Sequence, residues 1–300
     1  MELTEQQKKV VNSKSKRILV LSCAGSGKTT VIVNRIARLW SEGVAPDEIL
    51  VLTFSNKAAQ EMRKRIIKEE YETGKKVTVK TFHAFGYDII KRDASVLGYD
   101  GKIKIARSND TRNFLKEYYR KNSMPPLDDN DILSYIKKAK SFEPYQKIPA
   151  LENIVSAYNH DLRKKSAVDM DDMIALPVAL LESNLSIREL LLSQYKYVFV
   201  DEYQDTNEGQ NRLLDLITSA ETHLCLVGDD DQAIYEWRGA RPDYIKEKAV
   251  SGEYECLKLE ENFRSQGEII LVANKIISNN QNRVSKKIKA FREFIVLFQK

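Results

Sequence analysis

Short runs of apolar residues recur along the chain, and each is followed by a stretch in which apolar residues have helical spacing. The runs predict strands over residues 18–21, 49–54, 77–81, 197–200 and 224–227. Strands without a polar face must be covered on both sides, so the pattern predicts a parallel sheet with helices on each face. We therefore expect an α/β fold.

The strand pattern is interrupted between about residues 88 and 194. Apolar residues at helical spacing, separated by prolines, predict helices over 111–121, 132–140 and 154–165. The sequence therefore predicts an all-helical insertion in the α/β domain. The expected boundaries place the two parts of the α/β domain at 1–87 and 195–266, the insertion at 88–194, and a further segment at 267–300.

The composition is that of a folded globular protein, with 42% hydrophobic and 30% charged residues. The apolar stretches are shorter than the roughly 18 residues that a membrane helix needs. The amino terminus lacks the basic-then-apolar order of a secretory signal, and the three cysteines are far apart with no metal-ligand pattern beside them. We expect a cytoplasmic protein with no membrane segment and no structural zinc.

Basic residues are concentrated in two parts of the chain, although the net charge is only +5. Lys and Arg exceed Asp and Glu by six over residues 101–165, and again by six over 275–300. A polyanion such as nucleic acid would account for this distribution. Solvated helix faces would also account for it, so charge alone leaves both interpretations open.

The segment after the first predicted strand has the residue types of a phosphate-binding loop. Successive backbone N–H groups in such a loop cradle phosphates, Lys28 would reach the β and γ phosphates, and the Thr29 hydroxyl would ligate Mg²⁺. Ser22 stands where the usual pattern has glycine, and an ordinary strand-to-helix turn is the alternative. The ATP contacts expected from this loop are Ser22, Cys23, Ala24, Gly25, Ser26, Gly27, Lys28, Thr29 and Thr30.

Two acidic residues follow the predicted strand at 197–200. A nucleotide site needs a carboxylate for magnesium and a group that polarises the attacking water. We expect Asp201 to hold Mg²⁺ through water and Glu202 to act on the hydrolytic water. A charge pair at a helix N-terminus is the alternative interpretation of the two acids.

Longer motifs resemble those of the UvrD/Rep/PcrA-type superfamily 1 DNA helicases. The runs DEYQDTN at 201–207 and VGDDDQAIYEWRGA at 227–240 resemble motifs II and III of that family. Four shorter runs occur in the same order as in the family. There is similarity to the Q motif at 3–7, to motif Ia at 53–62, to the next DNA-contacting motif at 81–83 and to motif IV at 262–265. The resemblance covers almost the whole chain and implies a RecA-like P-loop NTPase sheet.

The resemblance assigns further nucleotide contacts. Gln232 would sense the γ phosphate, Arg264 would be an arginine finger on it, Phe263 would stack on adenine, and Gln7 would read the adenine edge. Gln7 also lies three residues after Thr4, so the pair can form a helix capping box, and both roles can hold. The implied catalytic residues are Lys28, Asp201, Glu202, Gln232 and Arg264, with ATP and Mg²⁺ as cofactors.

The resemblance also implies binding of single-stranded DNA and duplex junctions, with 3′ to 5′ polarity. Aromatic faces stack on bases of any sequence, as a translocating motor requires. Phe54 could instead be a core residue at a strand end, and His83 an ordinary loop histidine. The implied DNA contacts are Phe54, Asn56, Thr81, Phe82, His83, Tyr235, Trp237 and Arg238.

Helicases of this family close two RecA-like domains around ATP, whereas the similarity here stops soon after Lys286 and Lys287. Residues 267–300 are therefore expected to be the start of a truncated second motor domain, and the apolar run Phe294 to Phe298 would aggregate unless a partner covers it. Three functions remain open. The first is the ATP-binding half of a helicase, and the second is a non-hydrolysing module that binds ATP and single-stranded DNA. The third is a P-loop subunit that is completed in trans, through self-association or by a partner.

Overall fold

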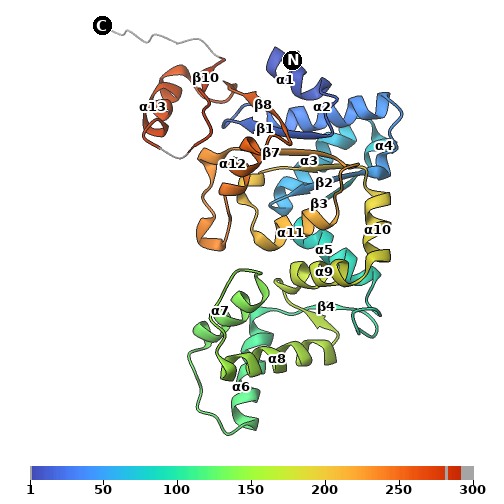
Figure 1. The fold of residues 1–300 in the computed structure, drawn as a ribbon, viewed down its shortest axis with the longest axis vertical. Coiled ribbons are helices and arrows are strands. Elements are labelled where there is room, and N and C mark those ends of the chain that lie inside the picture. The colour runs from blue at the N-terminus through green and yellow to red at the C-terminus, as the bar shows by residue number, and fades with distance from the viewer. Residues whose placement is uncertain (1, 281–282, 292–300) are drawn as a thin grey trace. The chain divides into compact units, whose positions relative to one another are not determined.

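The computed structural model describes residues 2–280 and 283–291. Its largest sheet has six parallel strands in the order β3-β2-β6-β7-β1-β8 (Figure 1). Leu19 of β1 is in register with Leu226 of β7 and Cys256 of β8. The strands are β1 (Arg17–Ser22), β2 (Ile49–Thr53), β3 (Thr78–Thr81), β6 (Tyr197–Val200), β7 (His223–Gly228) and β8 (Glu255–Leu259).

The sheet confirms the predicted α/β class and contains all five predicted strands to within one residue at each end. The sequence did not predict β8. This strand lies at the edge of the sheet, and Leu259 is its only buried residue. An edge strand with polar, exposed side chains has no continuous apolar run by which it could be recognised.

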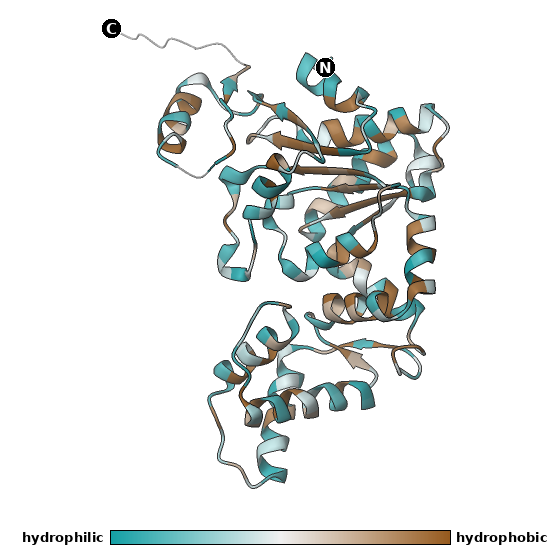
Figure 2. Ribbon diagram, viewed as in Figure 1, coloured by the Kyte–Doolittle hydropathy of each residue, from teal (hydrophilic) through white to brown (hydrophobic). Residues whose placement is uncertain are grey.

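Helices α1 (Glu5–Asn12), α2 (Lys28–Ser41) and α3 (Asn56–Glu69) contribute apolar residues to one core with Ile18 and Val20 of β1. The alternate residues Leu19 and Leu21 are equally buried. Figure 2 shows the central strands β1, β2, β6 and β7 as mostly hydrophobic. Both faces of the sheet are therefore covered, as the apolar runs indicate.

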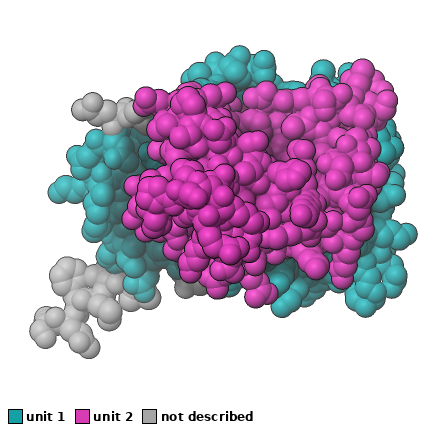
Figure 3. Space-filling view, turned by 90° about the horizontal axis from the view of Figure 1, so that it is seen from below, with its two compact units in different colours: residues 1–81, 190–207, 217–300 teal, residues 82–189, 208–216 magenta. Residues whose placement is uncertain are grey.

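The chain divides into two compact units, coloured separately in Figure 3. The described residues of unit 1 lie within 1–81, 190–207 and 217–300 and contain the six-stranded sheet. Besides the elements above, unit 1 holds the helices α4 (Tyr71–Gly74), α12 (Asp243–Val250) and α13 (Gly267–Ile277) and the parallel strand pair β9 (Glu261–Asn262) and β10 (Lys289–Ala290).

Unit 2 comprises residues 82–189 and 208–216. It is helical except for one short parallel strand pair, which the sequence pattern did not predict because two residues are too few to show alternation. Its elements are α5 (Phe82–Arg92), β4 (Lys104–Ile105), α6 (Ser108–Lys121), α7 (Asp129–Lys140), α8 (Pro149–Lys164), β5 (Ala167–Val168), α9 (Asp172–Ser183) and α11 (Glu208–Leu216). Helix α10 (Leu185–Gln194) crosses the boundary between the units.

The two units begin and end at other residues than the expected domains. Helices α5 and α11 both pack on α9, so they belong to unit 2 and not to the part that contains the sheet. The division into domains stays a prediction. The apolar run Phe294 to Phe298 lies outside the described residues. Within the described part of the chain, no helix combines the length and apolar character needed to cross a bilayer.

Candidate functional site

The phosphate-loop sequence forms a tight turn between β1 and α2. Gly25 and Gly27 have φ values of +69° and +85°, which residues with a Cβ rarely adopt. A Cβ at Gly25 would lie 2.7 Å from Arg264 Cβ, and one at Gly27 would lie 2.7 Å from Gln7 Nε2. The loop therefore needs glycine at both positions.

Ser22 and Cys23, both expected as ATP contacts, hold the loop to the rest of unit 1. The Ser22 hydroxyl donates to the carbonyl oxygen of Gly228 at 2.8 Å. Cys23 is buried against Ile270 and Ile288, and burial raises the pKa of its thiol to about 11. Neither side chain is available to a nucleotide in this arrangement.

Ser26 gives a direct indication of a ligand. Its Oγ is buried and has no hydrogen-bond partner among the described residues. A buried hydroxyl without a partner is costly, and a phosphate oxygen bound in the loop would supply that partner.

The strand order brings the acidic pair to this loop. Because β6 and β7 lie next to each other and β7 pairs with β1, their carboxyl ends lie at one edge of the sheet. Lys28 Nζ donates to Glu202 Oε2 at 2.6 Å, and Glu202 has φ of +54°. Burial, and then the charge of Glu202, raise the pKa of the Asp201 carboxyl. Burial therefore disfavours the ionised form of Asp201, and a cation bound beside this carboxylate would stabilise its negative charge.

Gln204 links the acidic pair to the end of β7. Its Nε2 donates to Glu202 Oε2 at 2.9 Å, and its Oε1 accepts from the backbone N–H of Asp229 at 2.9 Å. Gln232 Nε2 donates to Asp229 Oδ2. The proposed γ-phosphate sensor and the proposed catalytic base are thus connected by one hydrogen-bonded path.

The segment after β8 closes the site from the other side. The backbone N–H of Phe263 donates to the carbonyl oxygen of Gly25 at 2.9 Å, and Asn262 Nδ2 donates to that of Ala24. Asn262 Oδ1 also accepts from the N–H of Arg264 at 2.9 Å. The exposed guanidinium of Arg264 has no ion-pair partner in the described part of the chain, so it is available to an anion.

Gln7 makes the predicted capping-box contact and a second contact that the sequence did not predict. It forms the capping box with Thr4 at the start of α1, and its Nε2 donates to the carbonyl oxygen of Ser26 at 3.1 Å. The amide of Gln7 is therefore held beside the phosphate loop.

A cavity of about 410 Å³ lies beside the phosphate loop in unit 1. This is within the range of small-ligand pockets. Residues that line it include five of the loop residues, the acidic pair and two residues after β8: Gly25, Ser26, Gly27, Lys28, Thr29, Asp201, Glu202, Phe263 and Arg264. A glycine cradle, an unpartnered hydroxyl and two cations fit a polyphosphate. A hydroxyl and a buried carboxylate fit Mg²⁺, which prefers oxygen ligands.

A second set of predicted residues forms an aromatic surface in unit 1. The rings of Phe54 and Tyr235 stack with centroids 4.7 Å apart. Trp237 is 74% exposed, and the Arg238 guanidinium lies 4.6 Å from its ring centroid. Phe54 itself is half-buried and is not among the fully buried core residues.

Comparison with known proteins decides the family. A family model described as the UvrD/REP helicase N-terminal domain matches residues 3–251. The chain belongs to the UvrD/REP helicase family.

Several UvrD/REP relatives match nearly the whole chain. The ATP-dependent DNA helicase Rep of Buchnera aphidicola subsp. Schizaphis graminum is 35% identical over 98% of this chain and 47% of its own length. Rep of Escherichia coli K12 is 34% identical over 96% of the chain and 45% of its own length. The ATP-dependent DNA helicase PcrA of Leuconostoc citreum is 34% identical over 95% of the chain and 40% of its own length. The chain spans about half the length of these relatives.

Some residues that the UvrD/REP resemblance assigns to DNA are not on the aromatic surface. Thr81 and Phe82 are buried, the latter to 2% exposure. His83 is half-buried, and burial lowers the pKa of its imidazole. Asn56 is exposed at the start of α3. The ring of Phe82 thus has no free face in this arrangement, and the assignment of Asn56, Thr81, Phe82 and His83 to DNA stays a prediction.

Three residues of this UvrD/REP site were not recognised from the sequence. Gln204, Asn262 and Lys286 each hold a loop through contacts with residues far away in the chain. The only sequence signal for Lys286 is the run of three aspartates at 229–231, which lacks a local counter-charge.

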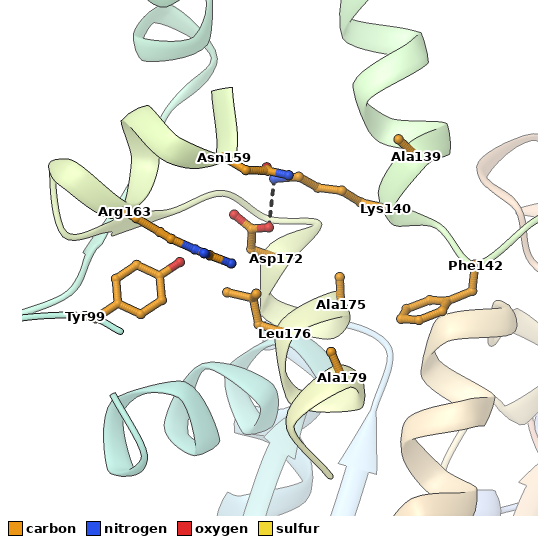
Figure 4. Close-up of a pocket in the computed structure, with 10 residues that line it drawn as sticks. All are labelled: Tyr99, Ala139, Lys140, Phe142, Asn159, Arg163, Asp172, Ala175, Leu176 and Ala179. Atoms are coloured by element: carbon orange, nitrogen blue, oxygen red, sulfur yellow. Dashed lines mark ion pairs between the residues drawn. The ribbon is translucent and has the colours of Figure 1, made fainter. Parts of the chain in front are cut away.

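Unit 2 contains a separate cavity of about 310 Å³ between α7, α8 and α9 (Figure 4). Lys140 points across it to Asp172, and Nζ lies 2.7 Å from Oδ1. Lys140 Nζ also lies 2.7 Å from Asp169 Oδ2. Lys140 thus forms a buried ion cluster with Asp169 and Asp172, while Asn159 Oδ1, which also lines the cavity, has no hydrogen-bond partner among the described residues.

Proposed function

We propose that the chain is the ATP-binding half of a DNA helicase that translocates on single-stranded DNA. The observation that carries this proposal is the contact between Lys28 and Glu202 beside a glycine cradle that contains the unpartnered Ser26 hydroxyl. The names of the relatives, ATP-dependent DNA helicases, support the substrate pair.

Each residue of the site has a distinct proposed role. Lys28 and the N–H groups of the loop bind phosphates, and Thr29 and Asp201 hold Mg²⁺. Glu202 accepts a proton from water, while Gln232 and Arg264 contact the γ phosphate. Mg²⁺ supplies charge neutralisation at the phosphates when bound. Phe263 and Gln7 contact the adenine.

The aromatic surface is proposed to bind DNA. Phe54, Tyr235 and Trp237 offer rings to bases, and Arg238 offers charge to phosphates. Contacts of this kind read no sequence, so we expect little sequence preference. Duplex junctions, 3′ to 5′ polarity and a cytoplasmic location stay predictions.

The domain assignment belongs to the same proposal. Residues 1–87 and 195–266 form the first motor domain, 88–194 its inserted subdomain, and 267–300 the start of a second motor domain. Self-association or a protein partner stays a prediction.

Nucleotide binding tests the proposal. Titration calorimetry with ATP and Mg²⁺ should show binding to the unmodified chain and to Lys64→Ala, which alters an exposed lysine of α3. Lys28→Ala should bind at least about tenfold more weakly, because it lacks the cation at the phosphates. Equal affinity in Lys28→Ala would contradict the proposed site. Binding without turnover would favour the non-hydrolysing module.

A further inference from the structure

Lys286 is a buried lysine whose ammonium group lies among three consecutive carboxylates. Its side chain is 1% exposed, and Nζ forms ion pairs with Asp229, Asp230 and Asp231. Arg283 adds a two-pronged pair with Asp231, at 2.7 Å for Nη2 to Oδ2 and 3.1 Å for Nε to Oδ1. The segment that follows α13, from residue 283 to residue 290, thus supplies both cations of the cluster, Arg283 and Lys286.

The cluster depends on these cations. The three carboxylates have oxygen atoms within 4.8 Å of one another, so they repel strongly at low exposure. Burial acts against the charge of Lys286, but the charges and hydrogen bonds of Asp229 and Asp230 outweigh it, and the pKa of Lys286 is raised. Without Lys286, one guanidinium would face three carboxylates.

Backbone contacts hold the same segment at two places. The N–H of Val284 donates to Asp230 Oδ2 at 2.8 Å. Farther on, the N–H of Lys289 donates to the carbonyl oxygen of Glu260 at 2.7 Å, and β10 pairs with β9. The segment therefore joins the loop after β7 to the strand that carries Asn262.

A continuous path of contacts leads from Lys286 to the nucleotide site. Lys286 pairs with Asp229, whose other carboxylate oxygen accepts from Gln232 Nε2. The backbone N–H of Asp229 donates to Gln204, and Gln204 donates to Glu202, the partner of Lys28. No side chain on this path is exposed. A shift of Asp229 therefore changes the position of both amides that touch it.

We propose that Lys286 is a positioning residue for the loop at 229–232, which carries the proposed γ-phosphate sensor Gln232. It fixes Asp229, and through Asp229 it fixes Gln232 directly and Glu202 by way of Gln204. This inference rests on the proposed function. It adds a residue that does not line the nucleotide cavity and comes from the segment after α13. The orientation of the sensing groups thus depends on a contact made near the end of the described chain.

The test compares nucleotides that differ in the γ phosphate. The dissociation constants of ADP and of a non-hydrolysable ATP analogue are measured with Mg²⁺ for the full chain, Lys286→Met, Lys286→Arg and Lys287→Met. Lys287 is the exposed neighbour and serves as the matched control. We expect the preference of Lys286→Met for the analogue over ADP to fall by about fivefold or more. Its affinity for ADP should change by less than about twofold. Lys286→Arg should recover part of the preference, and Lys287→Met should equal the unmodified chain.

A loss of folding would be separated from a loss of positioning by a second variant. Lys286→Met combined with Asp230→Asn restores the net charge of the cluster but not the contact with Asp229. This double variant should melt close to the unmodified chain and still lack the preference. A folded Lys286→Met or double variant that keeps the full preference would overturn the positioning role, as would an unmodified chain that binds both nucleotides equally. An unmodified chain that binds neither nucleotide would instead overturn the proposed function itself.

Discussion

The rings of Phe54 and Tyr235 stack on each other, with centroids 4.7 Å apart and planes inclined by 29°. Phe54 directly follows β2, and Tyr235 lies in the segment after β7. The stack therefore joins two loops at the carboxyl ends of their strands into one surface, beside which Trp237 and Arg238 are exposed. Geometry of this kind suits the stacking of bases regardless of sequence.

Replacement of Trp237 by alanine should weaken binding of single-stranded DNA. Loss of one stacked base costs about 1–3 kcal/mol, so the dissociation constant should rise by about 5- to 150-fold. Folding should be unaffected, because the ring is 74% exposed. Fluorescence anisotropy with a labelled oligonucleotide gives the affinities, and Tyr71→Ala, at another exposed aromatic residue, is the control. Equal affinities for Trp237→Ala and Tyr71→Ala would remove Trp237 from the DNA surface.

A methyl group at Gly25 should disrupt the phosphate loop. Gly25→Ala has to adopt a positive φ and also places Cβ 2.7 Å from Arg264 Cβ. Gly43→Ala has the same kind of backbone cost at φ of +88° but meets no atom within 4 Å. Both should lose about 1–2 kcal/mol of folding stability from the backbone. Only Gly25→Ala should also lose nucleotide affinity, as titration calorimetry would show. Equal effects of the two substitutions on nucleotide binding would contradict the close packing of Arg264 on the loop.

Asp201 should make the nucleotide-free chain less stable as the pH rises. Burial and the charge of Glu202 raise its pKa above the ordinary value of 3.8, so the folded state holds this proton more tightly than the unfolded state. The resulting stability is fully present below about pH 4 and is lost as the pH rises through the raised pKa. Asp205, whose pKa burial raises to about 6, adds a dependence of the same sign.

Asp201→Asn removes the Asp201 contribution, so its stability should vary less with pH. Thermal unfolding between pH 4 and 8 measures the difference, with the exposed Asp100→Asn as control. Asp201→Asn should melt higher than the unmodified chain at pH 8 and similarly at pH 4. A lower melting temperature at pH 8 would show that the ionised carboxylate stabilises the nucleotide-free fold.

Lys140 should contribute strongly to the stability of unit 2. Its Nζ lies 2.7 Å from both Asp169 and Asp172, and its side chain is 5% exposed. Lys140→Met leaves two carboxylates without their cation, which typically costs about 3–5 kcal/mol. Urea unfolding should show this loss, whereas Lys138→Met, on the exposed side of α7, should change stability by about 0.5 kcal/mol or less. A similar small effect of Lys140→Met would contradict the ion cluster.

Much of the sheet and of the phosphate loop could be predicted because the signals are local. The apolar runs identify β1 and β6, and Gly25, Gly27 and Lys28 lie within four residues. Edge strand β8 has no such run, since most of its side chains face solvent. The pair β4 and β5 is too short to show a period.

The connections between the loops could not be predicted for a different reason. Gln204 contacts Asp229, and Lys286 contacts Asp229 across 57 residues of sequence. Such contacts depend on the strand order β6-β7-β1, which the apolar pattern does not specify. Likewise, the family resemblance of residues 81–83 assigned Phe82 to DNA, whereas the burial of its ring follows only from the packing of α5.

Steady-state ATP hydrolysis, with and without single-stranded DNA, tests the proposed site most directly. The measurement compares the 300-residue chain with Glu202→Gln and with Glu247→Gln, which alters an exposed carboxylate of α12. We predict turnover that DNA stimulates in the unmodified chain and in Glu247→Gln, and that falls by about a hundredfold or more in Glu202→Gln, because Glu202 acts on the water. Turnover that persists undiminished in Glu202→Gln would contradict the account.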